Sequence, residues 1–264
     1  MKTKRLVIFG VSIALFIAVI AAAVNAVFTV SSVEVRFQTF SERGKEEAAV
    51  LQTQLDQTFL GRSTTFLNVN DVQTEVGKFP CFRVKTLEKQ FPRSVVISLE
   101  EREETFAYHR ENGGYAIFDS EGVYLYDREE NVNRLGGENI LVEGFSLTIP
   151  TSGNAVTGDG FSALLQLTDT FRYRLGTVRS NVRSVEFFER KNEGTYFRIV
   201  MQEGVVLEIH LPQQNMQEKA EAMIEAYEEL SETQKTYGYL DIIDLGDGEF
   251  HKPNHRDEIY VKND

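Results

Sequence analysis

The first 28 residues constrain this chain most strongly. Lys2, Lys4 and Arg5 are followed by an uncharged, apolar run from residue 6 to residue 28. At a rise of about 1.5 Å per residue, a helix of this run is about 34 Å long and can span a hydrocarbon core of about 30 Å. Because the basic residues lie only on its N-terminal side, the positive-inside rule puts the N-terminus in the cytoplasm. We therefore expect a short cytoplasmic tail (residues 1–5), a transmembrane helix (residues 6–28) and an extracytoplasmic body.

A cleaved signal peptide is the competing interpretation of the same run. Val24, Asn25 and Ala26 resemble a small-residue cleavage site. The apolar segment of a signal peptide is typically about 7–15 residues long, and this run is longer. The length therefore favours a retained anchor.

Charge and cysteine content narrow the possible functions. The chain has 28 Lys and Arg against 40 Asp and Glu, and three of the cations precede the apolar run. The acidic body is poorly suited to nucleic acid or to anionic lipid surfaces. Cys81 is the single cysteine of the sequence, which excludes an intrachain disulfide, and its apolar neighbours favour a buried structural role.

The segment after the anchor, residues 30–102, predicts a small α+β domain. Ser41 can cap a helix whose apolar residues recur at spacings of three and four. The elements expected in chain order are a strand at 33–37, a helix at 41–61, a second helix capped by Asn70 and ended by Pro80, and strands that start at Phe82 and Ser94. One sheet covered by two helices would bury both amphipathic stripes.

Residues 103–250 predict a mostly antiparallel β-domain with two helices. The first helix is expected to be capped by Asp159, and the second to run from 214 to 235. The candidate strands are 115–119, 123–126, 140–142, 182–188, 195–201, 205–211 and 239–245. The tail, residues 251–264, is polar and is expected either to be disordered or to add one strand at 258–261.

No residue pattern in the sequence indicates an enzyme. The common serine-acylation and phosphate-loop signatures are missing. His251 and His255 have the spacing of a helical zinc pair, but Pro253 opposes a helix between them. The acidic turn at 244–249 lacks the spacing of a calcium loop, and we interpret the carboxylates between 100 and 104 as a solvated strand end. We expect neither a cofactor nor a metal site.

Several motifs, in order, resemble the FtsQ/DivIB family of bacterial cell-division proteins. They are Phe79-Pro80, Phe91-Pro92, the strand 95–99 followed by Glu100-Glu101-Arg102, and the turn Asp119-Ser-Glu-Gly122. The resemblance identifies residues 30–102 as a POTRA domain with a βααββ order, and it extends over nearly the whole chain. It departs after Arg102, where family members usually carry a proline and this chain carries Glu103 and Glu104.

The resemblance implies a divisome scaffold in the bacterial cell membrane at the division septum. It implies that FtsL-type and FtsB/DivIC-type partners bind outside the membrane, and that this binding assembles or regulates septal peptidoglycan synthesis. No nucleic acid and no small-molecule substrate are expected. A partner strand is expected to pair with an exposed edge in the last strands, with contacts at Tyr239, Ile243, Leu245 and Phe250. The sheet edge at 95–99 is a second candidate surface, and a POTRA-containing adaptor of a secretion or envelope-assembly system is the alternative function.

Overall fold

The computed structural model describes residues 13, 15–20, 22–23, 26–246 and 248–257. Much of the expected transmembrane run, residues 6–28, and the end of the tail, residues 258–264, lie outside these positions. Within the described residues, no helix combines the length and the apolar character that a membrane crossing requires. The chain has a mixed α+β fold with mostly antiparallel strand pairing, and it divides into an N-terminal unit, Met1–Arg102, and a C-terminal unit, Glu103–Asp264.

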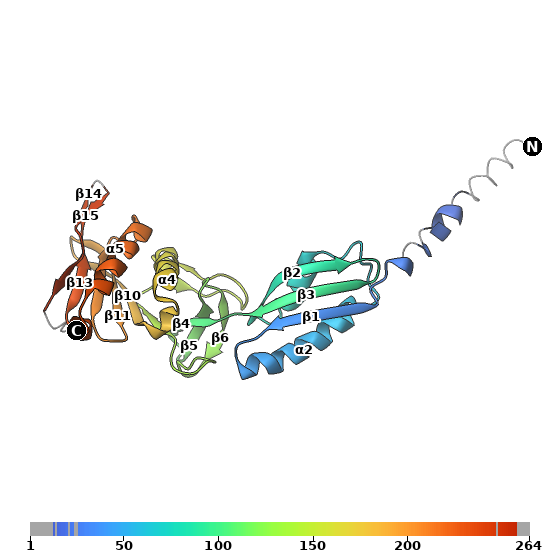
Figure 1. Cartoon of the computed structure of the whole chain (residues 1–264), viewed down its shortest axis with the longest axis horizontal. Helices are drawn as coiled ribbons and strands as arrows, with labels where there is room; N and C mark the ends of the chain where they lie inside the picture. Colours follow the sequence, from blue (N-terminus) through green and yellow to red (C-terminus); the bar gives the residue numbers. More distant parts are fainter. Residues whose placement is uncertain (1–12, 14, 21, 24–25, 247, 258–264) are drawn as a thin grey trace, which may run out of the picture. The chain divides into compact units, whose positions relative to one another are not determined.

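The N-terminal unit has the expected element order (Figure 1). Its elements are β1 (Ser32–Gln38), α2 (Glu42–Phe59), α3 (Val69–Val76), β2 (Phe82–Gln90) and β3 (Ser94–Glu101). β3 lies between the other strands, parallel to β1 and antiparallel to β2. The expectation of a free edge at 95–99 is therefore wrong, because both sides of β3 are already paired.

Two predicted helix caps are also wrong. Asn68, not Asn70, caps α3: its side chain accepts hydrogen bonds from the backbone N–H groups of Asn70 and Asp71, and Asp71 accepts one from the backbone of Asn68. This reciprocal capping box satisfies more helix-end donors than a cap at Asn70 could. In the C-terminal unit, α4 (Phe161–Leu175) begins after Gly160 in a left-handed conformation, with no capping bond from Asp159.

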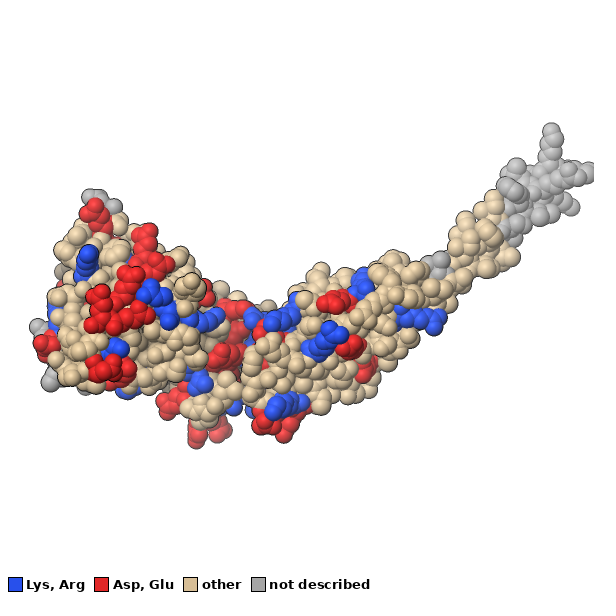
Figure 2. Space-filling view, viewed as in Figure 1, with Lys and Arg blue, Asp and Glu red and all other residues tan. Residues whose placement is uncertain are grey.

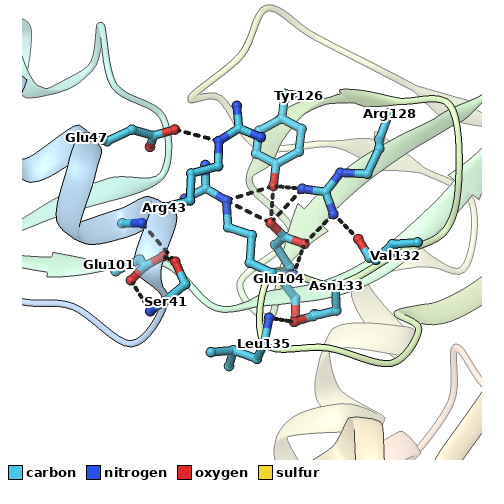
Figure 3. A network of polar contacts seen from close by, with 12 residues as sticks. Ser41, Arg43, Glu47, Glu101, Glu104, Tyr126, Arg128, Val132, Asn133 and Leu135 are labelled. Carbon is cyan, nitrogen blue, oxygen red and sulfur yellow. Dashed lines mark hydrogen bonds and ion pairs between the residues drawn. The ribbon is translucent and has the colours of Figure 1, made fainter.

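Glu101 is the polar anchor of the N-terminal unit (Figure 3). This side chain is buried, and it accepts hydrogen bonds from the backbone N–H of Phe40 at 2.7 Å and of Ser41 at 3.0 Å. The hydroxyl of Ser41 donates to the same carboxylate and accepts from the N–H of Gly44 at 2.9 Å, which caps α2. A Cβ at Gly44 would lie 2.2 Å from a Glu101 oxygen, so a larger residue there would displace this carboxylate from its hydrogen bonds. One carboxylate thus fixes the end of β3 to the start of α2.

The interpretation of the acidic run between residues 100 and 104 as a solvated strand end is therefore wrong for Glu101 and Glu104, whereas Glu103 is exposed. Glu104, in the C-terminal unit, is buried as well (Figure 3). It forms ion pairs with Arg128 at 3.3 Å and with Arg134 at 3.0 Å, and it accepts a hydrogen bond from the Tyr126 hydroxyl. Charge-assisted hydrogen bonds offset the cost of burying these carboxylates. Their partners lie far along the chain, so the local pattern could not reveal them.

The C-terminal unit contains a large mixed sheet with the strand order β16-β13-β12-β11-β10-β7-β4-β5-β6. Its strands are β4 (Glu104–His109), β5 (Tyr115–Asp119), β6 (Tyr124–Arg128), β7 (Ile140–Glu143), β10 (Val182–Arg190), β11 (Gly194–Met201), β12 (Val206–His210), β13 (Tyr239–Ile242) and β16 (Asn254–Arg256). Short pairs flank it: β8 (Leu147–Thr148) with β9 (Thr157–Gly158), and β14 (Asp244–Gly246) with β15 (Glu249–Phe250). The expected single strand 239–245 is thus broken at Ile243.

The hydrophobic core of the C-terminal unit lies between the large sheet and the helices α4 and α5 (Met216–Glu229). Alternate strand residues point into it, such as Phe197 and Ile199 on β11, and the apolar stripe of α5 packs against them as expected. Residues of β10, β11, β12 and β13 between these core positions point to the opposite side of the sheet. We call that side the polar face, and the candidate site lies on it.

We expect Glu101→Ala to lower the free energy of unfolding of the N-terminal unit by about 2–4 kcal/mol, because it leaves several buried donors without an acceptor. The exposed Glu103 offers a matched control, and Glu103→Ala should change the free energy by less than about 0.5 kcal/mol. Denaturant unfolding followed by amide hydrogen exchange measures both. Equal effects of the two substitutions would contradict the anchoring role of Glu101.

Candidate partner-binding site

A row of charged side chains crosses the polar face near the last strands. Glu186 on β10 pairs in register with Arg198 on β11, which in turn pairs with Glu208 on β12. Glu208 lies opposite Asp241 on β13. The Arg198 guanidinium lies 2.8 Å from the Glu186 carboxylate and 3.1 Å from that of Glu208, and Arg190 approaches Glu208 at 2.9 Å. We call Glu186, Arg198, Glu208 and Asp241 the charged row.

Aromatic rings shield the charged row from water. The rings of Phe188 and Tyr196 are stacked with centroids 5.6 Å apart. The guanidinium carbon of Arg198 lies 4.4 Å from the Phe188 ring centre, and that of Arg190 lies 4.4 Å from the centre of Tyr196. As a result Arg198 is 8% and Glu208 is 4% exposed. Each charge depends on its partners, because an unpaired charge at this depth would be costly.

A cavity of about 240 Å³ lies at the end of the charged row, with Tyr196, Tyr239, Asp241, Ile243 and Arg256 among its lining residues. The Arg256 guanidinium lies 2.7 Å from Oδ2 of Asp241. Oδ1 of Asp241 is buried, and it has no hydrogen-bond partner among the described residues. Burial raises the pKa of the Asp241 carboxyl, and the charge of Arg256 opposes this rise.

Lys219 on α5 fixes the backbone next to this cavity. Its side chain is fully buried, and its ammonium donates to the carbonyl oxygens of His210 at 2.8 Å and Leu211 at 3.1 Å. It also forms an ion pair with Asp244 at 3.0 Å. Because Asp244 is held under α5, the chain leaves the large sheet at Ile243 and turns into the β14–β15 hairpin. This contact explains why the predicted strand 239–245 is broken.

The predicted contact residues lie around the cavity and on the β14–β15 hairpin, and they differ in how exposed they are. Tyr239 and Ile243 both line the cavity, and Ile243 is 36% exposed. Leu245 projects from the β14–β15 hairpin and is 54% exposed. Phe250 is half-buried and packs against the hydrophobic core. Ile243 and Leu245 are therefore available for side-chain contacts, whereas Phe250 also supports the fold.

The expected exposed edge is wrong for β13. Its residues pair with β12 on one side and with β16 on the other, so Tyr239, Leu240 and Asp241 are opposite Arg256, His255 and Asn254. Part of the tail that was expected to be disordered forms β16 at 254–256, and the strand expected at 258–261 lies outside the described residues. Among the described residues, β16 is the last strand at this end of the large sheet.

The polar residues that build the site were not predicted from the sequence. Arg198, Glu208 and Asp241 are single charges within apolar strand sequences, YFRIV, VLEIH and YLDII. Three such strands, aligned by period-two alternation, indicate a charged row on one face. Arg256 and Lys219 had no comparable local signal. Across the described residues, no group of His, Cys, Asp and Glu side chains is arranged to hold a metal ion.

We expect Lys219→Met to lower the free energy of unfolding of the C-terminal unit by about 3 kcal/mol, because buried acceptors and the carboxylate of Asp244 lose their donor. The hydrogen bond from Lys219 lowers the pKa of Asp244. A carboxyl with a lowered folded-state pKa stabilises the fold above its unfolded pKa of about 3.9, and this contribution is lost as the pH falls through the folded value. The substitution should therefore also flatten the loss of stability below about pH 4.

Urea unfolding at a series of pH values measures both effects. The matched control is Lys191→Met at an exposed lysine, which should change the free energy of unfolding by less than about 0.5 kcal/mol. An unchanged acid profile in Lys219→Met would contradict the assigned coupling between Lys219 and Asp244.

Comparison with known proteins does not identify a family for this chain. No protein-family model matches the chain, and a search of curated proteins found no match. The functional assignment therefore depends on the motifs in the sequence and on the residues of the site.

Proposed function

We propose that this chain is a divisome scaffold of the FtsQ/DivIB type. In this proposal residues 6–28 anchor it once in the bacterial cell membrane, with the N-terminus in the cytoplasm and the body outside. The body binds FtsL-type and FtsB/DivIC-type partners at the division septum and thereby assembles or regulates septal peptidoglycan synthesis. It acts by binding and has no catalytic role. The motifs quoted from the sequence and the βααββ order of the N-terminal unit support this proposal, and that unit would be the POTRA domain.

The site on the C-terminal unit is the observation that carries the proposal. Tyr239 and Ile243 share one cavity beside the last strands of the large sheet, and Leu245 lies exposed on the adjoining hairpin. The resemblance implied partner contacts in this segment, and the fold gathers apolar, aromatic and charged groups there. A partner strand can gain affinity from backbone hydrogen bonds at a sheet end and specificity from side-chain pockets.

We expect Leu245→Lys to weaken binding of the external segment of an FtsL-type or FtsB/DivIC-type protein by about tenfold or more, because an exposed apolar contact is replaced by a charge. The full chain in detergent micelles is titrated with each segment. Leu135→Lys is the control, because Leu135 is 46% exposed, lies in the loop between β6 and β7 and is not among the lining residues of the cavity. Phe250→Lys is less suitable, since Phe250 also packs on the core.

The outcomes separate the two candidate functions. Saturable binding that falls in Leu245→Lys and not in Leu135→Lys supports the scaffold and its site. If the folded full chain binds neither segment, the scaffold proposal is wrong, and the alternative of an adaptor in a secretion or envelope-assembly system is tested next. Binding that is equal in both variants would retain the scaffold but place its contact surface elsewhere.

The proposed topology gives a separate expectation in living cells. A fluorescent protein fused to the N-terminus should gather at the division septum, and the body should be cleaved by a protease added to cells whose outer layers have been removed. A fusion spread evenly through the cytoplasm, with a body resistant to the protease, would contradict both the anchor and the location.

A further inference from the structure

β16 covers the outer side of β13 through a short stretch of backbone pairing and contacts of polar side chains. It has three residues, Asn254, His255 and Arg256, and none of these side chains is apolar. Apart from the strand pairing, Arg256 forms the ion pair with Asp241, lies 5.6 Å from the Tyr239 ring centre and donates to the Tyr239 hydroxyl at 3.4 Å. The His255 ring contacts the Tyr237 ring edge to face at 5.8 Å and the carbonyl oxygen of Tyr237 at 3.3 Å. Short elements without apolar anchors open locally at a small free-energy cost. β16 is therefore the part of the large sheet best suited to be exchanged.

Asp241 is incompletely satisfied by β16. Arg256 contacts Oδ2, whereas Oδ1 is buried without a hydrogen-bond partner among the described residues. A buried acceptor without a donor is costly, and the cost is larger for a carboxylate. A binding segment that supplies donors to both oxygens would gain free energy that β16 does not provide.

The charges around the cavity favour a cation as that donor. Glu193, Glu208 and Asp241 line the cavity together with Arg190 and Arg256, so the carboxylates outnumber the cations in its lining. If Arg256 moves away with β16, this excess becomes larger. Figure 2 shows that Asp and Glu side chains also gather over the part of the C-terminal unit where Figure 1 places α5, which packs on the core side of the sheet, opposite the polar face. An approaching basic segment would be attracted to the carboxylates that line the cavity.

We propose that β16 is a replaceable cover, and that a partner docks by taking its place: an extended segment pairs antiparallel with β13 and sets a Lys or Arg side chain on Asp241. This inference rests on the proposed function and specifies the chemistry of the partner. In the absence of the partner, β16 covers the backbone groups of β13. Exposed edge strands otherwise tend to pair with other chains. Arg256 in β16 occupies the position that the partner's basic side chain takes over.

The exchange predicts opposite effects for the two residues of one ion pair. Arg256→Gln weakens the hold of β16 on Asp241 and Tyr239, so it should tighten binding of the partner segment by about threefold to tenfold. Asp241→Asn removes the anchor on which the partner makes more hydrogen bonds than β16 does, so it should weaken binding by about threefold or more. A purely structural role of the pair would change the affinity in the same direction in both variants.

The affinities of the full chain and its variants for the external segment of the FtsB/DivIC-type protein test this prediction. The matched control is the ion pair of Arg110 with Asp127, at 3.4 Å, near the β6 end of the large sheet. Arg110→Gln and Asp127→Asn should leave the affinity unchanged. If the unaltered chain binds but Arg256→Gln and Asp241→Asn shift the affinity in the same direction, or not at all, the exchange is wrong and the proposed function stands. If the unaltered chain does not bind, the proposed function fails, and the exchange fails with it.

Hydrogen exchange on the unaltered chain gives a readout that needs no variant. In the complex, the backbone amides of 254–256 should lose their protection, while those of 239–241 remain protected by the partner strand. Protection of 254–256 that is the same in the complex and in the free chain would overturn the proposal, whatever the affinities show.

Discussion

The C-terminal unit depends on the pairing of Glu208 with Arg198 and Arg190. Glu208 lies in the middle of a strand and is 4% exposed, which would be prohibitive for an unpaired carboxylate. Its partners come from β10 and β11, and its register partner across the next strand is Asp241. The charges thus favour one alignment of four consecutive strands, because a one-residue slip would turn them into the hydrophobic core. The same alignment forms the wall of the cavity at the end of the row.

Period and spacing in the sequence were enough to predict most of the elements. The helix stripe of Ala48, Leu51, Leu55 and Phe59 is buried in α2 as expected, and the βααββ order follows from it and from the flanking strands. What could not be predicted are interactions between distant parts of the chain. Glu101 bonds residues 60 positions away, and Lys219 reaches Asp244 from another element. Similarly, the three polar residues of β16 carry no alternation strong enough to predict a strand.

In the candidate site, too, the local sequence pattern was predictable and the contacts between distant residues were not. Ile243 and Leu245 were identifiable as apolar residues near the end of the chain, but their exposure results from the contact of Asp244 with Lys219, which ends β13 early. Asp241 was not identified, although it is buried and one of its carboxylate oxygens has no hydrogen-bond partner among the described residues. Buried groups whose pKa is raised by desolvation often mark functional positions, because a fold gains no stability from them. The stability of the sheet requires buried polar groups to be fully paired, whereas the proposed binding function uses Asp241, which is not fully paired among the described residues.

The most direct test of the central claim is photo-crosslinking in dividing cells. A photoreactive amino acid at Leu245 of the full chain should cross-link to an FtsL-type or FtsB/DivIC-type protein, and the same amino acid at Leu135 should not. This pair compares two exposed leucines of one unit under identical conditions. Cross-links to a division partner from Leu245 alone are the result that the account predicts. No cross-link from Leu245, or the same products from both positions, would contradict it.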